Sequence, residues 1–168
     1  MSTEPMYVLM LKEDYENDDL ITGPSEYELY DKADFTARFG NEAGIQSRNI
    51  NKEKEDRIKA AKDFVHLIGN DICYVDDDAV KFRENAKEIF AQRKLKELKK
   101  AVDGMTSDEF LRLGEWKIRN ILRNMFWHVH PYGENCQGEY PQAPEDFIIN
   151  HMENGESYIV SEIIYVHY

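Results

Sequence analysis

The sequence predicts an α+β fold built on one antiparallel or mixed sheet that includes both terminal strands, covered by about three central helices. Two observations lead to this prediction. Apolar, strand-like segments stand near the two ends, at 6–11 and 158–168, and helical patterns mass between them without a regular alternation with strands. The chain has 168 residues, so we expect a single domain over 1–168 with one hydrophobic core.

The first strand is expected at 6–11, a continuous apolar run that ends at Lys12 and is rich in strand-forming residues. The polar stretch 13–23 predicts a loop, and 27–39 shows weak helical spacing of aromatic residues before two glycines interrupt the pattern. Asn51 is a good N-cap for a helix over 52–68, which has an apolar stripe and a glycine stop at Gly69.

A short strand is expected at 72–75, followed by a longer helix over 78–102. The three aspartates between them, Asp76, Asp77 and Asp78, would stabilise the N-terminal end of that helix. Their alternative use is as an Asp-x-Asp pair for magnesium. Basic residues crowd the second half of the same helix, where they complement the helix dipole or contact phosphate.

A third helix is expected over 107–126, because Thr106 and Glu109 stand at the spacing of a capping box. Its apolar residues, among them Phe110, Leu111 and Ile118, predict a buried face. After it we expect a strand at 127–132, a loop with glycine and proline over 133–144, and a short helix over 144–152.

The charge is strongly acidic and unevenly distributed. The net charge is −12, which disfavours direct binding to nucleic acid because phosphate neutralisation needs clustered Lys and Arg. Residues 1–31 hold nine acidic side chains and one basic one, and 132–168 hold seven acidic side chains and no basic one. The middle of the chain is mildly basic, with 17 acids and 20 bases. We expect the terminal carboxylates to converge on one surface if the end strands pair.

The cellular setting is expected to be the cytoplasm, without membrane association. Cys73 and Cys136 form neither a CxxC pair nor a dense framework, so they are expected to be reduced thiols. The N-terminal segment lacks the basic and apolar regions of a signal peptide, and no stretch approaches the roughly 20 apolar residues of a membrane span.

The histidines give one hypothesis of chemistry, a zinc site. His128 and His130 would point to the same face of a strand, and Cys136 or His151 could complete a tetrahedral set. With Glu134 or Asp146 nearby, such a site would fit a metal-dependent hydrolase or nuclease. The alternative is that these are half-exposed structural histidines, in which case no cofactor is expected.

Other catalytic patterns are absent from the sequence. No glycine-rich phosphate loop or Gly-x-Ser-x-Gly elbow occurs, and neither cysteine has a nucleophile signature. The acidic run after the first strand fails the EF-hand pattern, because a calcium loop begun at Asp14 has Asp19 at the glycine position and Ser25 at the glutamate position. This run is therefore either a solvated loop or an acidic docking surface, which would consist of Glu13, Asp14, Glu16, Asp18 and Asp19.

The function that the sequence favours is a non-catalytic, acidic interaction protein. Carboxylates on a rigid surface can occupy a groove meant for phosphates, so we expect a modulator or inhibitor that mimics nucleic acid and docks on the basic surface of a larger, nucleic-acid-handling protein, of the type that mobile elements or phages encode. The metal-dependent hydrolase or nuclease that uses His128 and His130 is one alternative. The other is a structural subunit of an assembly that uses its C-terminal strand as an edge contact, and the oligomeric state stays open.

Overall fold

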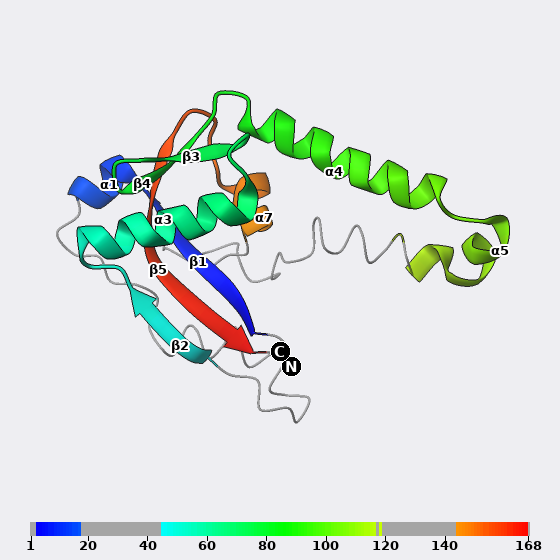
Figure 1. The fold of residues 1–168 in the computed structure, drawn as a ribbon, viewed down its shortest axis with the longest axis horizontal. Coiled ribbons are helices and arrows are strands. Elements are labelled where there is room, and N and C mark those ends of the chain that lie inside the picture. Colours follow the sequence, from blue (N-terminus) through cyan, green and yellow to red (C-terminus); the bar gives the residue numbers. More distant parts are fainter. Residues whose placement is uncertain (1–2, 18–44, 117, 119–143, 168) are drawn as a thin grey trace.

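The computed structural model describes residues 3–17, 45–116, 118 and 144–167. Figure 1 shows the elements in chain order. They are β1 (Thr3–Leu11), α1 (Lys12–Asn17), β2 (Ile45–Ile50), α3 (Lys54–Ile68), β3 (Cys73–Asp76), β4 (Ala79–Phe82), α4 (Ala86–Asp103), α5 (Ser107–Glu109), a π-helix (Phe110–Gly114), α7 (Pro144–Asn150) and β5 (Ser157–His167).

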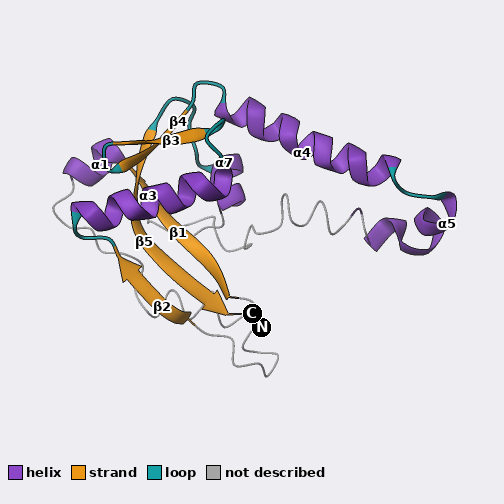
Figure 2. Ribbon diagram, in the orientation of Figure 1, coloured by secondary structure: helices purple, strands orange, loops and turns teal. Residues whose placement is uncertain are grey.

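The strands form one five-stranded antiparallel sheet, which confirms the predicted α+β fold (Figures 1 and 2). The order is β1-β5-β4-β3, and β2 also pairs with β5. The two terminal strands are direct neighbours, in register from Thr3 opposite His167 to Leu11 opposite Tyr158, with a bulge at Val8/Leu9. The prediction that both end strands share one sheet is therefore confirmed.

The edge of β5 that faces away from β1 is shared by two strands and one side chain. β4 pairs with the start of β5 at Tyr158, and β2 pairs with its second half from Glu162 onward. Asn51 lies between them: its main-chain N donates to Ser161 O at 2.9 Å, and its side-chain Nδ2 donates to Val160 O at 3.0 Å. Buried carbonyl groups need such partners. Asn51 thus closes the gap in the sheet edge.

The predicted role of Asn51 as a helix N-cap is wrong. The helix begins at Lys54 with Glu53 at the N-cap position, and no side chain caps it. Asn51 instead belongs to the sheet. It follows the last residue of β2, Ile50, and continues the pairing of β2 with β5 by one more hydrogen bond. The strand β2 was itself not predicted, since its sequence IQSRNI is too polar to give a strand pattern.

Helix α3 lies over the sheet and supplies much of the core (Figure 1). Aromatic rings run through this core in edge-to-face contact, with 5.2 Å between the ring centroids of Tyr7 and Phe64 and 4.9 Å between those of Phe147 and Tyr158. The helix ends as predicted at Gly69, whose φ of 115° is open to glycine and whose N–H donates to Val65 O.

The aspartates 76–78 do not start a helix, which corrects the prediction. They form the turn of the β3–β4 hairpin, in which Asp76 pairs with Ala79 and Val75 with Val80. Asp77 has a φ of 55°, a left-handed conformation that Asp tolerates better than most residues. The segment 79–82 forms a strand because Ala79, Val80 and Phe82 are buried there, and α4 begins only at Ala86.

The helical cover of the sheet is smaller than expected. Helix α4 buries only Ala86 and Phe90, and the rest of it extends away from the sheet (Figure 1). The capping box of Thr106 and Glu109 is confirmed, since each side chain accepts a hydrogen bond from the other residue's main-chain N–H. The buried face predicted after it is wrong at Phe110 and Leu111, which are 58% and 81% exposed.

Helix α7 bears out the short helix predicted from residue 144. The helix predicted at 27–39, the strand at 127–132 and the loop at 133–143 lie outside the described residues. None of the helices in the described ranges is long and apolar enough to cross a membrane.

The position of Asn51 in the sheet leads to a prediction about stability. Asn51→Asp replaces the donor to Val160 O with a carboxylate oxygen, so we expect a loss of about 2–3 kcal/mol in the free energy of unfolding, measured by urea denaturation. Asn49→Asp adds the same charge at an exposed position of β2 and should change that free energy by less than about 0.5 kcal/mol. Equal losses in the two variants would contradict the assignment of Asn51.

Burial of Cys73 leads to a prediction about alkaline pH. Burial raises the pKa of the Cys73 thiol to about 12, so the folded state keeps a proton that the unfolded chain loses from about pH 8.5. The free energy of unfolding has its full value below that pH and declines as the pH rises toward 12. The decline should be about 2 kcal/mol between roughly pH 8 and 10.5. Urea denaturation at both pH values should show a smaller decline in Cys73→Ala. Val80→Ala, at another buried site, should keep the full decline.

Candidate functional site

The structure places three of the five predicted docking residues on α1. Glu13, Asp14 and Glu16 are exposed on this short helix, which follows β1 directly and replaces the loop expected from residue 13. Asp18 and Asp19 lie outside the described residues. No ion pair or side-chain hydrogen bond joins Glu13 or Asp14 to any other residue in the described part of the chain.

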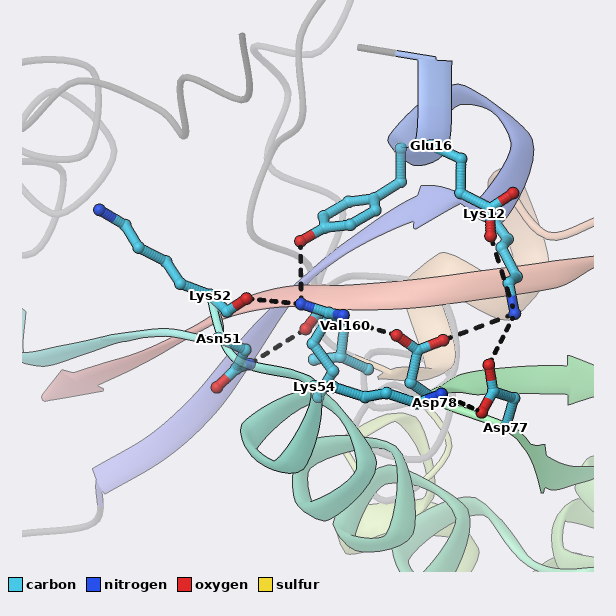
Figure 3. A network of polar contacts seen from close by, with 10 residues as sticks. Lys12, Glu16, Asn51, Lys52, Lys54, Asp77, Asp78 and Val160 are labelled. Carbon is cyan, nitrogen blue, oxygen red and sulfur yellow. Dashed lines mark hydrogen bonds and ion pairs between the residues drawn. The ribbon is translucent and has the colours of Figure 1, made fainter. Parts of the chain in front are cut away.

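The same helix turns two side chains inward. Lys12 places its Nζ 3.5 Å from Asp77 Oδ2 and 3.5 Å from Asp78 Oδ1, and it also lies 3.9 Å from Glu16 Oε1 on its own helix (Figure 3). Tyr15 is half-buried and contacts the side chain of Arg57. The helix α1 therefore has an anchored side and an acidic, water-facing side.

Arg57, near the start of α3, is the centre of the anchor. Its Nε donates to Asp78 Oδ2 at 2.8 Å, and its Nη1 donates to Lys52 O at 2.6 Å and to the Tyr15 hydroxyl at 3.4 Å. The guanidinium also lies 5.4 Å from the centroid of the Tyr15 ring. Only 14% of the Arg57 side chain and 9% of the Asp78 side chain are exposed. A buried pair of this kind is tolerated when hydrogen bonds satisfy both charges, as they do here.

The pKa values of the surrounding groups follow from this arrangement. A hydrogen bond from Lys54 Nζ, 2.6 Å from Asp77 Oδ1, holds the pKa of the Asp77 carboxyl below its usual range. Burial acts to lower the pKa of Lys12, but the charges of Asp78 and Asp77 outweigh it, so that this pKa is raised. Lys12 and Asp77 therefore stay charged at neutral pH and attract each other.

We call Lys12, Tyr15, Lys54, Arg57, Asp77 and Asp78 the anchor network (Figure 3). It joins three elements that are far apart in the sequence: α1, the start of α3 and the β3–β4 turn. Sequence reasoning missed it, because it assigned the aspartates to a helix terminus. The one usable signal was the position of 76–78 between two short apolar segments, which is typical of a hairpin turn.

The terminal carboxylates do not all belong to the acidic surface. Glu162, on β5, is only 2% exposed and lies within the sheet between Val8 of β1 and Ile50 of β2. The prediction that the terminal carboxylates converge on one surface therefore does not hold for Glu162. Within the described residues, the acidic cluster beside the anchor network consists of the three exposed carboxylates of α1.

The residues of the metal hypothesis are not brought together in the described structure. His128, His130, Glu134 and Cys136 lie outside the described residues. His151 is exposed directly after α7, and Asp146 lies on α7. Within the described ranges, no group of three or more His, Cys, Asp or Glu side chains is placed to hold a metal ion.

Nucleophilic chemistry at Cys73 is disfavoured by its surroundings. Its thiol is buried in β3 and its pKa is raised by burial to about 12, so that the reactive thiolate is scarce at neutral pH. The acidic side of α1 can accept hydrogen bonds and attract cations, and it offers no general base held against a nucleophile.

Comparison with known protein families, curated proteins and solved structures gives no match for this chain.

The anchor network predicts unequal effects for two neighbouring aspartates. Asp78→Asn leaves the charge of Arg57 buried without its counter-ion, so the free energy of unfolding should fall by about 3 kcal/mol. Asp76→Asn makes the same chemical change at an exposed position of β3 and should cost less than about 0.5 kcal/mol. Thermal and urea denaturation measure both. Indistinguishable midpoints for the two variants would mean that Asp78 is not the counter-ion that compensates the buried charge of Arg57.

Proposed function

We propose that this chain is a non-catalytic interaction protein that docks through the acidic side of α1 on a basic surface of a larger protein. The proposal rests on the two different sides of α1, one bound to the fold and one exposed to water. Lys12 and Tyr15 bind it to the body of the fold, and Glu13, Asp14 and Glu16 face water. A helix held in this way presents its carboxylates at fixed spacing.

Fixed spacing matters for recognition because an ordered surface loses little conformational entropy when it binds. Carboxylates accept charge-assisted hydrogen bonds from Arg and Lys, as phosphate oxygens do. A basic groove that normally holds a nucleic-acid backbone would therefore accept the acidic side of α1. On this basis we propose a modulator or inhibitor of a nucleic-acid-handling protein, of the type that mobile elements or phages encode.

Charge also supports a protein partner over nucleic acid itself. The chain carries a net charge of −12, which repels a polyanion and attracts a basic surface over long range. We propose that this docking occurs in the cytoplasm, where the Cys73 thiol, which forms no disulfide within the described residues, stays reduced.

The test is the association rate of a triple charge reversal, Glu13→Lys, Asp14→Lys and Glu16→Lys, with the partner recovered from the native host by pull-down. We expect the association rate constant to fall at least about tenfold and to lose much of its dependence on salt, because the reversal removes the steering charges. The dissociation rate should change much less. Stopped-flow or surface-based kinetics at several salt concentrations measures both constants.

The control is a second triple reversal with the same net charge, Asp63→Lys, Glu88→Lys and Asp103→Lys, at exposed carboxylates on α3 and α4. It should slow association far less, since its changes lie away from α1. If both triple variants associate at the same rate, net charge alone steers binding and the acidic side of α1 is not the docking surface.

A further inference from the structure

The arm formed by α4 carries an apolar stripe, the arm seam, that is not buried in the core of the described structure. Beyond Phe90, which is buried, the helix extends away from the sheet (Figure 1). Leu95 is 51% exposed and Val102 is 45% exposed. The arm seam consists of Ala91, Leu95, Leu98 and Val102 on α4, together with Met105, which follows just after the helix ends at Asp103.

The spacing of the arm seam is that of a coiled coil. On the helix its members follow one another at intervals of four, three and four residues, which is the alternation of the d and a positions of a heptad repeat. Such a narrow stripe fits the side chains of one partner helix, whereas a helix that lies in a membrane surface needs a broader apolar face.

The tip of the arm continues the seam as an open apolar surface. Phe110, Leu111 and Trp116 are 58%, 81% and 62% exposed. Phe110 and Leu111 line two adjoining shallow hollows. One, of about 360 Å³, also includes Val102 and Met105 from the seam, and the other, of about 460 Å³, includes Ile118.

The backbone conformation at the tip determines where the Phe110 ring lies. Residues Phe110–Gly114 form a π-helix, a conformation that is rare and frequently found at functional sites. A Cβ at Gly114 would lie 2.8 Å from Phe110 Cδ2, so glycine lets the ring lie directly against the backbone. Met105 Sδ lies on the same side, 3.4 Å from that position, which joins the tip to the seam.

The charges beside the seam determine what it can bind. Between 94 and 100 the arm carries four lysines and one glutamate, and Lys94 and Lys99 occupy the positions that flank the seam. Two copies of this helix would place lysines against lysines, which disfavours pairing of the arm with itself. A partner helix with acidic flanking residues would instead form ion pairs along both sides.

We propose that the arm seam and the tip bind an amphipathic helix of a partner protein whose apolar stripe is flanked by acidic residues. The occupant lies along Leu95, Leu98 and Val102 and inserts a side chain between Phe110 and Leu111 at the tip. This surface is basic and apolar, the opposite of the acidic side of α1, so it goes beyond the docking function proposed above and does not depend on it.

The probe is a synthetic peptide of about three heptads with Leu at a and d and Glu at e and g, and its control has Lys at e and g. Titration of the full chain with each labelled peptide, followed by fluorescence anisotropy, measures the dissociation constants. We expect the Glu peptide to bind at least about tenfold more tightly than the Lys peptide. The difference should shrink as salt is added.

Variants locate the binding. The pair Leu95→Asp and Leu98→Asp should weaken the Glu peptide at least about tenfold, and Leu111→Ser with Trp116→Ser should weaken it severalfold. Leu67→Asp, at an exposed leucine of α3, should leave binding unchanged. Unaltered thermal unfolding of the seam variants shows that they remain folded.

Three results would overturn the proposal. The first is equal affinity for the two peptides, or unchanged affinity in the seam variants. The second is a dimer of the parent chain that sedimentation detects and that Leu95→Asp abolishes, with no binding of the Glu peptide. The third is seam-dependent binding to vesicles of anionic lipid, again without binding of the peptide, since the arm would then be a membrane-surface helix.

Discussion

The pairing of β5 on both of its edges is the constraint on which the rest of the described structure depends. β1 occupies one edge along nearly its whole length, and β4, Asn51 and β2 divide the other. Because every buried carbonyl on that second edge must have a donor, the gap between two strands must be filled by one polar residue. This requirement fixes where β2 ends, and therefore where α3 starts on the sheet (Figure 2).

The anchor network follows from that placement. The β3–β4 hairpin is joined to β5 through β4, so its turn brings Asp77 and Asp78 to the start of α3 and to α1. The apolar core between α3, α7 and the sheet supplies most of the stabilising burial. The buried pair of Arg57 and Asp78 adds little net stability, because removal of two charges from water offsets much of their attraction. Its main effect is to hold neighbouring elements in position. Its consequence is the fixed orientation of α1.

What could be predicted from the sequence was local. The terminal strands, the helix at 52–68 and the Thr106 capping box depend on periodicity or on residues three apart, and all are present. Asn51 and Asp78 could not be assigned, because their partners Val160 and Arg57 lie 109 and 21 residues away. The acidic residues of α1 were found by their charge, but their helix and its anchor were not. Asp18, Asp19, His128, His130 and Cys136 lie outside the described residues, so those predictions stay predictions.

We infer that the anchor network holds the acidic side of α1 in place. Hydrogen–deuterium exchange of the amides in α1, compared between the parent chain and Asp78→Asn under conditions where both are folded, tests it most directly. We expect the α1 amides of the variant to exchange at least about tenfold faster, while the amides at the centre of α3 keep their protection. Equal protection of α1 in both proteins would show that the acidic side of α1 is held without the pair of Arg57 and Asp78, and that the anchor network does not have this role.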